Sequence, residues 1–298
     1  MTPAISPLRG VALVLGAALL WGTTGTAQSL APAQLSSYWV GALRLVASGV
    51  FFAAWLAATE RRALAPAALG GLPWRGITLA AVCMSAYNLA FFAGVRASGV
   101  AVGTAIALGS GPVWAGVLQA VMQRRPPSAT WWAGTALAVG GGALMIAGGS
   151  HTLPFTPLGV GLCLLAGLSY AVYALVNQGL VSGASAGAVT GAVFSGAALL
   201  ALPVAGALAG PPLLQTSDLV IVAWLGVMST GVAYLLFSHA LRHISGATAV
   251  ALALAEPVTA FALAVLIVGE RPGMWALLGL LAVLAGLAVV IRAELRRP

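Results

Sequence analysis

The stretch Ser98–Val113, SGVAVGTAIALGSGPV, returns later in the chain as Ser245–Val258, SGATAVALALAEPV. Each copy opens with Ser-Gly, continues as an apolar run and ends on a proline followed by a valine, at Pro112 and Pro257. Further matched pairs are Tyr87 with Tyr234, Ser98 with Ser245, and Arg125-Pro126 with Arg271-Pro272. The offsets of 145 to 147 residues allow one or two short insertions or deletions, so the chain contains an internal repeat.

The composition around this repeat is that of a membrane protein. Of 298 residues, 61% are hydrophobic and 6% are charged, and the mean hydropathy is +1.04. A water-facing surface cannot be built from such a chain. All 13 basic residues are arginine and the net charge is +8, but no basic patch is interleaved with aromatic residues. A nucleic-acid partner is therefore not expected, and membrane orientation explains the charge better.

Apolar windows of about 20 residues, separated by helix breakers, predict an all-α integral membrane protein with ten transmembrane helices in the lipid bilayer. The first window follows Arg9 and is interpreted as an uncleaved span, because nine more windows follow it. The windows are roughly 9–30, 35–58, 75–95, 100–122, 129–148, 157–178, 186–208, 218–240, 246–268 and 273–292.

The repeat divides these ten helices into two halves. Residues 1–150 hold the first five helices and residues 151–298 hold the second five. Because five is odd, the second copy must enter the membrane from the opposite side, which makes the repeat inverted. Two inverted five-helix repeats around a central cavity are typical of transporters, because the mirrored halves can exchange conformations and open to either side in turn.

The arginines predict the orientation of a multi-pass protein of the cell inner membrane. With the first residue inside, ten arginines fall in inner segments and two in outer loops, which places both termini in the cytoplasm. The inner ones are Arg9, Arg61, Arg62, Arg75, Arg124, Arg125, Arg242, Arg292, Arg296 and Arg297. The outer ones are Arg96 and Arg271.

Polar side chains inside lipid are costly, so their distribution predicts which helices face a cavity. In the first helix such residues recur at i, i+3 and i+7, on one helical face, and the sixth helix repeats this spacing. The predicted wall consists of Trp21, Thr24, Gln28, Tyr87, Asn88, Ser110, Tyr170, Tyr173, Asn177, Thr230, Tyr234, Ser238, His239 and Glu256. The alternative for any one of them is a bond to a neighbouring helix or a place at the membrane interface. A wall of rings, hydroxyls and amides suits a small amphipathic solute with an apolar body.

The fifth and tenth helices are nearly free of polar residues. They are expected to lie away from the pathway, against lipid or a second subunit, with glycines that allow close packing. The sequence therefore leaves a monomer and a homodimer open.

Pro112 and Pro257 interrupt matched points of the two halves, which is the pattern of a transporter's hinge or site; a tolerated packing kink is the alternative. Two ionisable groups lie deep in the spans, Arg44 and Glu256. Arg44 extends toward the interface, bonds helix-end carbonyls or meets a substrate carboxylate. Glu256 is a structural carboxyl bonded across the kink, a proton carrier or solute contact, or half of an ion pair.

The sequence contains few signals for catalysis, metal binding or a cofactor. The segment Gly183–Gly187 formally fits G-x-S-x-G but lacks the strand-turn-helix setting and credible Asp and His partners. The chain contains no lysine and hence no ATP-binding phosphate loop, and no His/Cys/Asp/Glu spacing indicates a metal. Cys83 and Cys163 are single cysteines in apolar runs. No catalytic residue, metal or cofactor is expected.

Several motifs together resemble the EamA-type branch of the drug/metabolite transporter superfamily. They are ALLWGTTG at Ala18–Gly25, Arg44, LALAEPVTAFALAVLIVGERP at Leu252–Pro272, and a glycine-rich last helix in each half. The resemblance covers nearly the whole chain and implies ten helices, two inverted halves, a central cavity and export of a small metabolite. Within the branch the chain looks most like the aromatic amino-acid exporters of the YddG type.

These observations predict a secondary transporter that exports amino acids, with aromatic ones favoured, and related small metabolites by alternating access. The small-molecule substrate would stack on the tyrosines and tryptophans of the cavity wall. Efflux of drugs or other hydrophobic compounds is the first alternative, and a membrane-embedded enzyme is a remote one.

Overall fold

The structure of the chain is a computed structural model that describes residues 6–29, 35–147, 156–268 and 272–296. In these residues all regular structure is helical and no strand occurs. The α-helices are α1 (Pro7–Ser29), α2 (Ser37–Thr59), α3 (Pro66–Gly70), α4 (Trp74–Ser98), α5 (Val100–Met122), α6 (Ala129–Ala147), α7 (Pro157–Gly183), α8 (Ala186–Ala209), α9 (Thr216–Gly226), α10 (Ala233–Ala240), α11 (Gly246–Leu252), α12 (Glu256–Leu263) and α13 (Met274–Leu295). Short 3₁₀ segments are Arg61–Leu64 and Ala253–Ala255, and π segments are Val227–Val232 and Ala264–Val268.

Within the described residues, nine helical spans are long and apolar enough to cross a membrane. Two of them are assembled from shorter pieces, because α9 and α10 continue through a π segment as Thr216–Ala240, and α11 and α12 continue as Gly246–Ile267. Helix α6 is not among the nine, although it is a helix of 19 residues. The structure therefore gives a multi-pass membrane protein.

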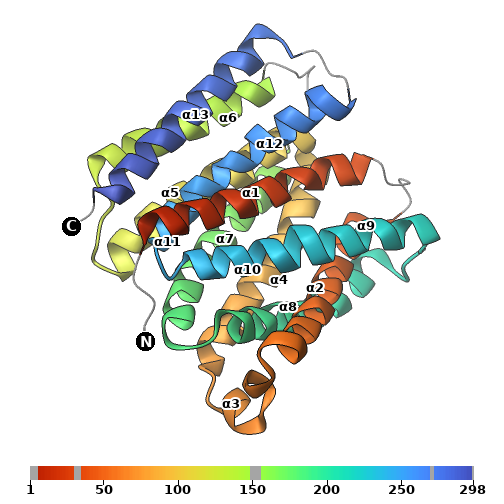
Figure 1. Cartoon of the computed structure of the whole chain (residues 1–298). Helices are drawn as coiled ribbons and strands as arrows, with labels where there is room; N and C mark the ends of the chain where they lie inside the picture. Colours follow the sequence, from red (N-terminus) through yellow and green to blue (C-terminus); the bar gives the residue numbers. More distant parts are fainter. Residues whose placement is uncertain (1–5, 30–34, 148–155, 269–271, 297–298) are drawn as a thin grey trace.

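Helices α6 and α13 form a pair at one side of the bundle (Figure 1). A Cβ added to Gly141 would lie 2.7 Å from the carbonyl oxygen of Gly279, and one added to Gly134 would lie 2.9 Å from that of Gly286. Only glycine permits such an approach of two backbones. The pairing of 134 with 286 and of 141 with 279 makes the two helices antiparallel.

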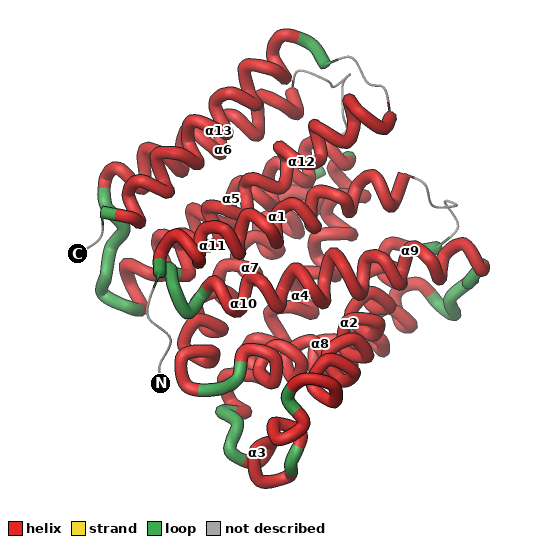
Figure 2. Tube along the Cα trace, viewed as in Figure 1, coloured by secondary structure: helices red, strands yellow, loops and turns green. Residues whose placement is uncertain are grey.

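The remaining helices form the body of the molecule, with α7 at its centre against α4 and α5 (Figure 2). Helix α1 lies between α10 and α12, and α2 packs along α8. The glycines that allow this include Gly22, where an added Cβ would lie 2.8 Å from the Glu256 carbonyl oxygen, and Gly167, where it would lie 2.8 Å from the Ala107 carbonyl oxygen. Small residues thus bring α1 onto α12 and α5 onto α7.

The two matched prolines differ in their surroundings. Pro112 lies inside the continuous helix α5, which tolerates the loss of one backbone hydrogen bond. Pro257 lies in the first turn of α12, directly after the 3₁₀ turn Ala253–Ala255. Proline suits a first turn because its missing N–H has no intrahelical partner there. The paired interruption that the sequence predicts is therefore a break in the second half only.

Candidate functional site

Aromatic rings from four helices meet in the interior of the bundle. The Trp21 ring centroid lies 5.1 Å from that of Tyr234 and 6.2 Å from that of Tyr170. The Tyr170 ring in turn lies 5.4 Å from Tyr87, and Tyr173 lies 5.8 Å from Tyr234. These separations are those of favourable edge-to-face and offset ring pairs. Five of the rings predicted to wall a cavity, from α1, α4, α7 and α10, thus form one group, called the ring cluster below.

Two phenylalanines that the sequence reasoning left out complete the ring cluster. Phe237 lies 5.6 Å from Trp21 and 5.9 Å from Tyr170, and Phe194 of α8 lies 4.6 Å from Tyr234. Both are fully buried. A phenylalanine in an apolar helix carries no signal that separates it from ordinary packing, so only the three-dimensional structure reveals it.

Two rings of the cluster carry a buried polar atom without a hydrogen-bond partner among the described residues, Trp21 Nε1 and the Tyr170 hydroxyl. These two residues are 6% and 8% exposed. Asn88, which follows Tyr87 in α4, has an unpartnered Oδ1, while its amide nitrogen donates to the carbonyl of Met84 in its own helix, at 2.9 Å. These three atoms have a hydrogen-bonding capacity that no described residue uses.

Asn177 and Ser238 belong to a polar network that connects the ring cluster, at Tyr173, to α8. The Asn177 amide donates to the Ser238 hydroxyl at 2.9 Å and to the Tyr173 hydroxyl at 3.2 Å, and Thr190 donates to Ser238 at 2.7 Å. Asn177, Ser238 and Thr190 are fully buried. In this structure these groups tie α7, α8 and α10 together, as in the alternative of bonds between neighbouring helices.

Other predicted wall residues form hydrogen bonds outside the ring cluster. Thr24 shares a 2.7 Å hydrogen bond with Ser229 of the π segment Val227–Val232. The Ser110 hydroxyl donates to the Ala107 carbonyl, and His239 Nδ1 lies 2.8 Å from the carbonyl of Leu235. The side chain of Gln28 lies outside the described residues. None of these three described side chains is joined to the ring cluster by a hydrogen bond.

Arg44 is buried and is oriented by the π segment. Its Nε donates to Thr230 at 2.9 Å, and its guanidinium carbon lies 6.0 Å from the ring centroid of Phe92. The Thr230 hydroxyl donates onward to the Leu225 carbonyl, five residues earlier, at 2.7 Å. Gly226 lets α2 approach, because an added Cβ would lie 3.0 Å from the Arg44 carbonyl oxygen. The local unwinding therefore positions a charge, as π bulges commonly do at functional sites.

Glu256 is the first residue of α12 and is half-buried. Its carboxyl lies within electrostatic range of the Tyr87 and Tyr170 hydroxyls and of Arg44. Arg44 is in turn within electrostatic range of Tyr87 and Tyr234. Both deep charges are therefore within electrostatic range of Tyr87 in the ring cluster. The Glu256 carbonyl lies against Gly22, the neighbour of Trp21, and the Nε of Arg44 binds Thr230.

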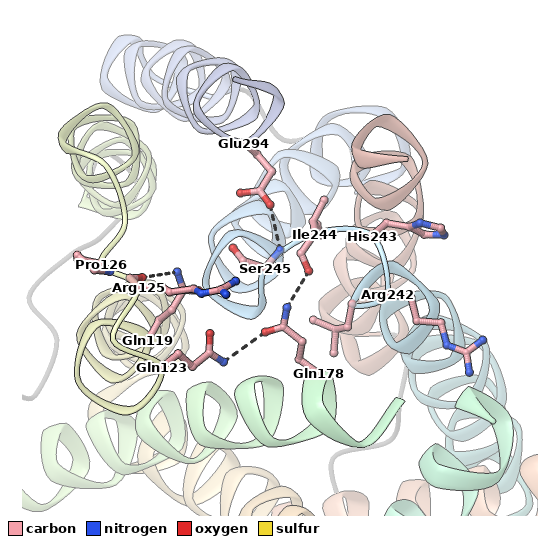
Figure 3. A pocket seen from close by; sticks show the side chains of 11 residues that line it. Gln119, Gln123, Arg125, Pro126, Gln178, Arg242, His243, Ile244, Ser245 and Glu294 are labelled. Carbon is pink, nitrogen blue, oxygen red and sulfur yellow. Dashed lines mark hydrogen bonds between the residues drawn. The ribbon is translucent and has the colours of Figure 1, made fainter. Parts of the chain in front are cut away.

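A polar pocket of about 430 Å³ lies at the end of the bundle where α11 begins. Figure 3 shows Gln119, Gln178 and Glu294 reaching this point from α5, α7 and α13. Their side chains accept from three successive backbone N–H groups, Glu294 from Ser245 at 3.0 Å, Gln178 from Gly246 at 3.1 Å and Gln119 from Ala247 at 3.4 Å. Side chains thus satisfy N–H groups that a helix start leaves unpaired. The sequence reasoning missed these residues, because each is a single polar residue near a span end.

His243 marks the same end of the bundle. Its Nδ1 accepts from the backbone N–H of Ser6 at 3.3 Å, which brings the start of α1 to the α10–α11 link. Burial lowers the pKa of the His243 imidazole, and the positive charges of Arg9 and Arg242 lower this pKa further. Arg242 donates to the carbonyls of Val181 and Ala184. The start of α1, the end of α7 and the end of α13 are therefore at one end of the molecule.

An apolar groove of about 580 Å³ runs over the surface at the other end of α1, between α9 and α12. Trp224 lies in it and donates from Nε1 to Thr23 at 3.0 Å. The neighbouring Val220 and Ile267 are 70% and 63% exposed. Such exposed apolar area faces lipid in a membrane protein.

No group of three His, Cys, Asp or Glu side chains suited to a metal occurs in the part of the chain that the structure describes. Cys83 and Cys163 are free and buried. The chemistry of the interior is therefore that of rings, hydroxyls, amides and two opposite charges.

Comparison with known proteins connects this arrangement to a family. The model of the EamA-like transporter family matches residues 8–147 and again residues 157–292. The chain belongs to the EamA-like transporter family. A curated relative from Bacillus subtilis (strain 168), the uncharacterized transporter YwfM, is 36% identical over 284 residues, which are 94% of this chain and 93% of the relative.

A solved crystal structure shares the fold of this EamA-like protein. It superposes with a TM-score of 0.84 at 18% sequence identity, over 98% of this chain and 99% of the other. The family and the relative together make the protein a membrane transporter, as its sequence predicts.

Proposed function

We propose that this transporter exports amino acids, with aromatic ones favoured, and related small metabolites across the inner membrane by alternating access. The ring cluster carries the proposal. Trp21 and Tyr87 of the first half meet Tyr170 and Tyr234 of the second half there. A flat aromatic side chain fits among such rings. A site shared by both halves is also the geometry that rocking of one half against the other opens to alternate sides.

Contacts between helices support two inverted repeats of five spans. Helix α6 of the first half pairs with α13 of the second, and α2 pairs with α8. In the predicted repeat the counterpart of α4 is the span of α9 and α10, and the counterpart of α7 is α1. The contact of α4 with α7 therefore corresponds to the contact of α10 with α1. The start of α1 and the end of α13 lie at one end of the bundle, which supports an even number of crossings. We therefore count α6 as a span in addition to the nine, which gives ten. The halves are residues 1–150 and 151–298.

The end of the bundle around His243 is the cytoplasmic end in this proposal. Arg9, Arg125, Arg242 and Arg292 belong to segments at this end. Basic residues accumulate on the cytoplasmic side of membrane proteins. The outward face of α13, with Trp275 and Leu281 each 62% exposed, is covered by lipid or by a second copy.

Release from liposomes that contain the purified protein tests the proposal. Each liposome preparation is loaded with one radiolabelled amino acid. We expect protein-dependent release of phenylalanine, tryptophan, threonine and methionine down a gradient. Release of none of these amino acids, from liposomes that contain correctly folded protein, would reject the substrate assignment. Repeating the assay for Glu256→Gln with and without a pH gradient separates a proton-coupled exporter from a facilitator, because only coupling through Glu256 makes the response to the pH gradient differ between the two proteins.

The apolar groove beside Trp224 favours the alternative of efflux of hydrophobic compounds, since such solutes reach a transporter from the lipid. Cells that express the protein distinguish the two functions. Resistance to toxic amino-acid analogues supports export of amino acids, and resistance confined to hydrophobic drugs supports the alternative.

A further inference from the structure

The ring cluster contains polar atoms that packing alone does not explain. Trp21 Nε1, the Tyr170 hydroxyl and Asn88 Oδ1 are buried without a partner among the described residues. A buried donor or acceptor without a partner is unfavourable, so native structures leave few of them. Two such atoms on neighbouring rings, Trp21 and Tyr170, indicate a place where a polar solute supplies the missing partners.

Two opposite charges lie near the same rings. The Nε of Arg44 binds Thr230, which leaves the two terminal nitrogens of the guanidinium to form a paired interaction with a carboxylate. Glu256 is half-buried, and Tyr87 lies within electrostatic range of both charges. An uncharged apolar solute would leave Arg44 and Glu256 without compensation when it displaced water.

A free amino acid carries a carboxylate and an ammonium group on one carbon. We propose that Arg44 binds the carboxylate and Glu256 binds the ammonium group of a single zwitterionic amino acid, whose side chain contacts the ring cluster. This inference rests on the proposed function and assigns its specificity to two residues. It also gives the halves different tasks, because Gly111 occupies the position of Glu256 in the first half and carries no charge.

Removing one charge at a time from the solute tests this assignment. Binding of L-phenylalanine, phenylalaninamide, which lacks the carboxylate, and N-acetyl-L-phenylalanine, which lacks the ammonium group, is measured by titration calorimetry on purified protein. The unmodified protein should bind phenylalanine roughly tenfold or more tightly than either analogue, the effect of one lost charged contact.

Two substitutions test which residue of the protein binds which charged group of the amino acid. Glu256→Gln should weaken phenylalanine binding roughly tenfold and leave N-acetyl-L-phenylalanine binding unchanged, because that analogue makes no contact with the carboxylate. Arg44→Gln should weaken phenylalanine binding similarly and leave phenylalaninamide binding unchanged. Because Arg44 also holds Thr230, size-exclusion chromatography checks that this variant folds; the nearly isosteric Glu256→Gln tests the assignment without it.

Each contrary outcome has a definite meaning. Equal weakening of phenylalanine and N-acetyl-L-phenylalanine by Glu256→Gln overturns the inference. Equal binding of all three compounds by the unmodified protein overturns it as well, while release of phenylalanine from liposomes still upholds the proposed function. Absence of both binding and release of phenylalanine overturns the proposed function and this inference together.

Discussion

The two halves of this transporter differ in the regularity of their helices. In the first half, α4 and α5 are unbroken and meet directly at Gly99, whose φ of 80° only glycine adopts readily. In the second half, the matching spans contain the π segments Val227–Val232 and Ala264–Val268 and the 3₁₀ turn Ala253–Ala255. Similar sequences thus build a regular half and an interrupted half.

The π segment Val227–Val232 and the 3₁₀ turn Ala253–Ala255 contain or adjoin the residues that form the polar contacts. Thr230, the partner of Arg44, and Ser229, the partner of Thr24, lie in the first π segment. Glu256 follows the 3₁₀ turn directly. We therefore expect the regular first half, which contains Arg44, to be the more rigid support and the interrupted second half, which contains Glu256, to be the part that moves.

The largest expected effect concerns helices α6 and α13, where the halves are alike. Gly141→Ala and Gly279→Ala should each lower the free energy of unfolding by about 3 kcal/mol, the upper range for overpacking. The reason is that an added Cβ lies 2.6 Å from the Val283 nitrogen in one case and 2.5 Å from the Met145 nitrogen in the other. Thermal unfolding in detergent measures the loss.

Gly140→Ala is the matched control, because nothing lies within 4 Å of its added Cβ. It should be neutral or slightly stabilising, as a glycine-to-alanine change in a helix permits. An equal loss for Gly140→Ala and Gly141→Ala would show that the α6–α13 contact is not as close as described.

The second prediction concerns the π segment. Thr230→Val should lower the free energy of unfolding by about 2 kcal/mol, because Arg44 loses the acceptor of its Nε and the hydroxyl bond to Leu225 disappears. Thr230→Ser keeps the hydroxyl and should retain most of the stability. Little or no loss for Thr230→Val would show that these two hydrogen bonds do not stabilise the segment.

The third prediction compares the two prolines in the liposome assay. Pro257→Ala should slow phenylalanine release roughly tenfold, a change of about 1.4 kcal/mol in the barrier, because alanine permits an unbroken helix across residues 253–256. Pro112→Ala should change the rate less than about twofold, because α5 is already continuous. Equal slowing by both would mean that the two halves share the hinge.

The smallest expected effect is the pH dependence of stability at His243. Its pKa is lowered in the folded protein by burial and by Arg9 and Arg242, so the unfolded chain binds the proton more readily. This contribution to stability is full above the ordinary histidine pKa of about 6.5 and is lost as the pH falls toward the lowered value. Thermal unfolding at several pH values should show a smaller acid sensitivity for His243→Gln than for the unmodified protein. An identical acid sensitivity would contradict the role of His243.

The sequence predicts an all-helical multi-pass membrane protein, as the structure has it, because long apolar windows are local signals. The tenth span and the inverted repeat stay predictions. The spacing at i, i+3 and i+7 places Trp21, Tyr170 and Tyr173 on predicted cavity-facing sides of their helices, and Tyr87 and Tyr234 join the same predicted wall as polar residues within spans. That this wall binds a solute stays a prediction.

The sequence does not predict the π segments, because these depend on packing between distant helices, such as Gly226 against Ala47 and Gly231 against Phe51. For the same reason the bonds from Gln119, Gln178 and Glu294 to the start of α11 are found only in the structure.

Amide hydrogen exchange with and without phenylalanine tests the central claim most directly, namely that substrate binds between the halves and acts on the interrupted one. The matched segments are residues 227–232 and 253–256 of the second half and residues 80–85 and 108–111 of the first. The account predicts that phenylalanine slows exchange clearly more in the second-half segments than in their first-half matches. Equal changes in both halves, or no change in either, would contradict it.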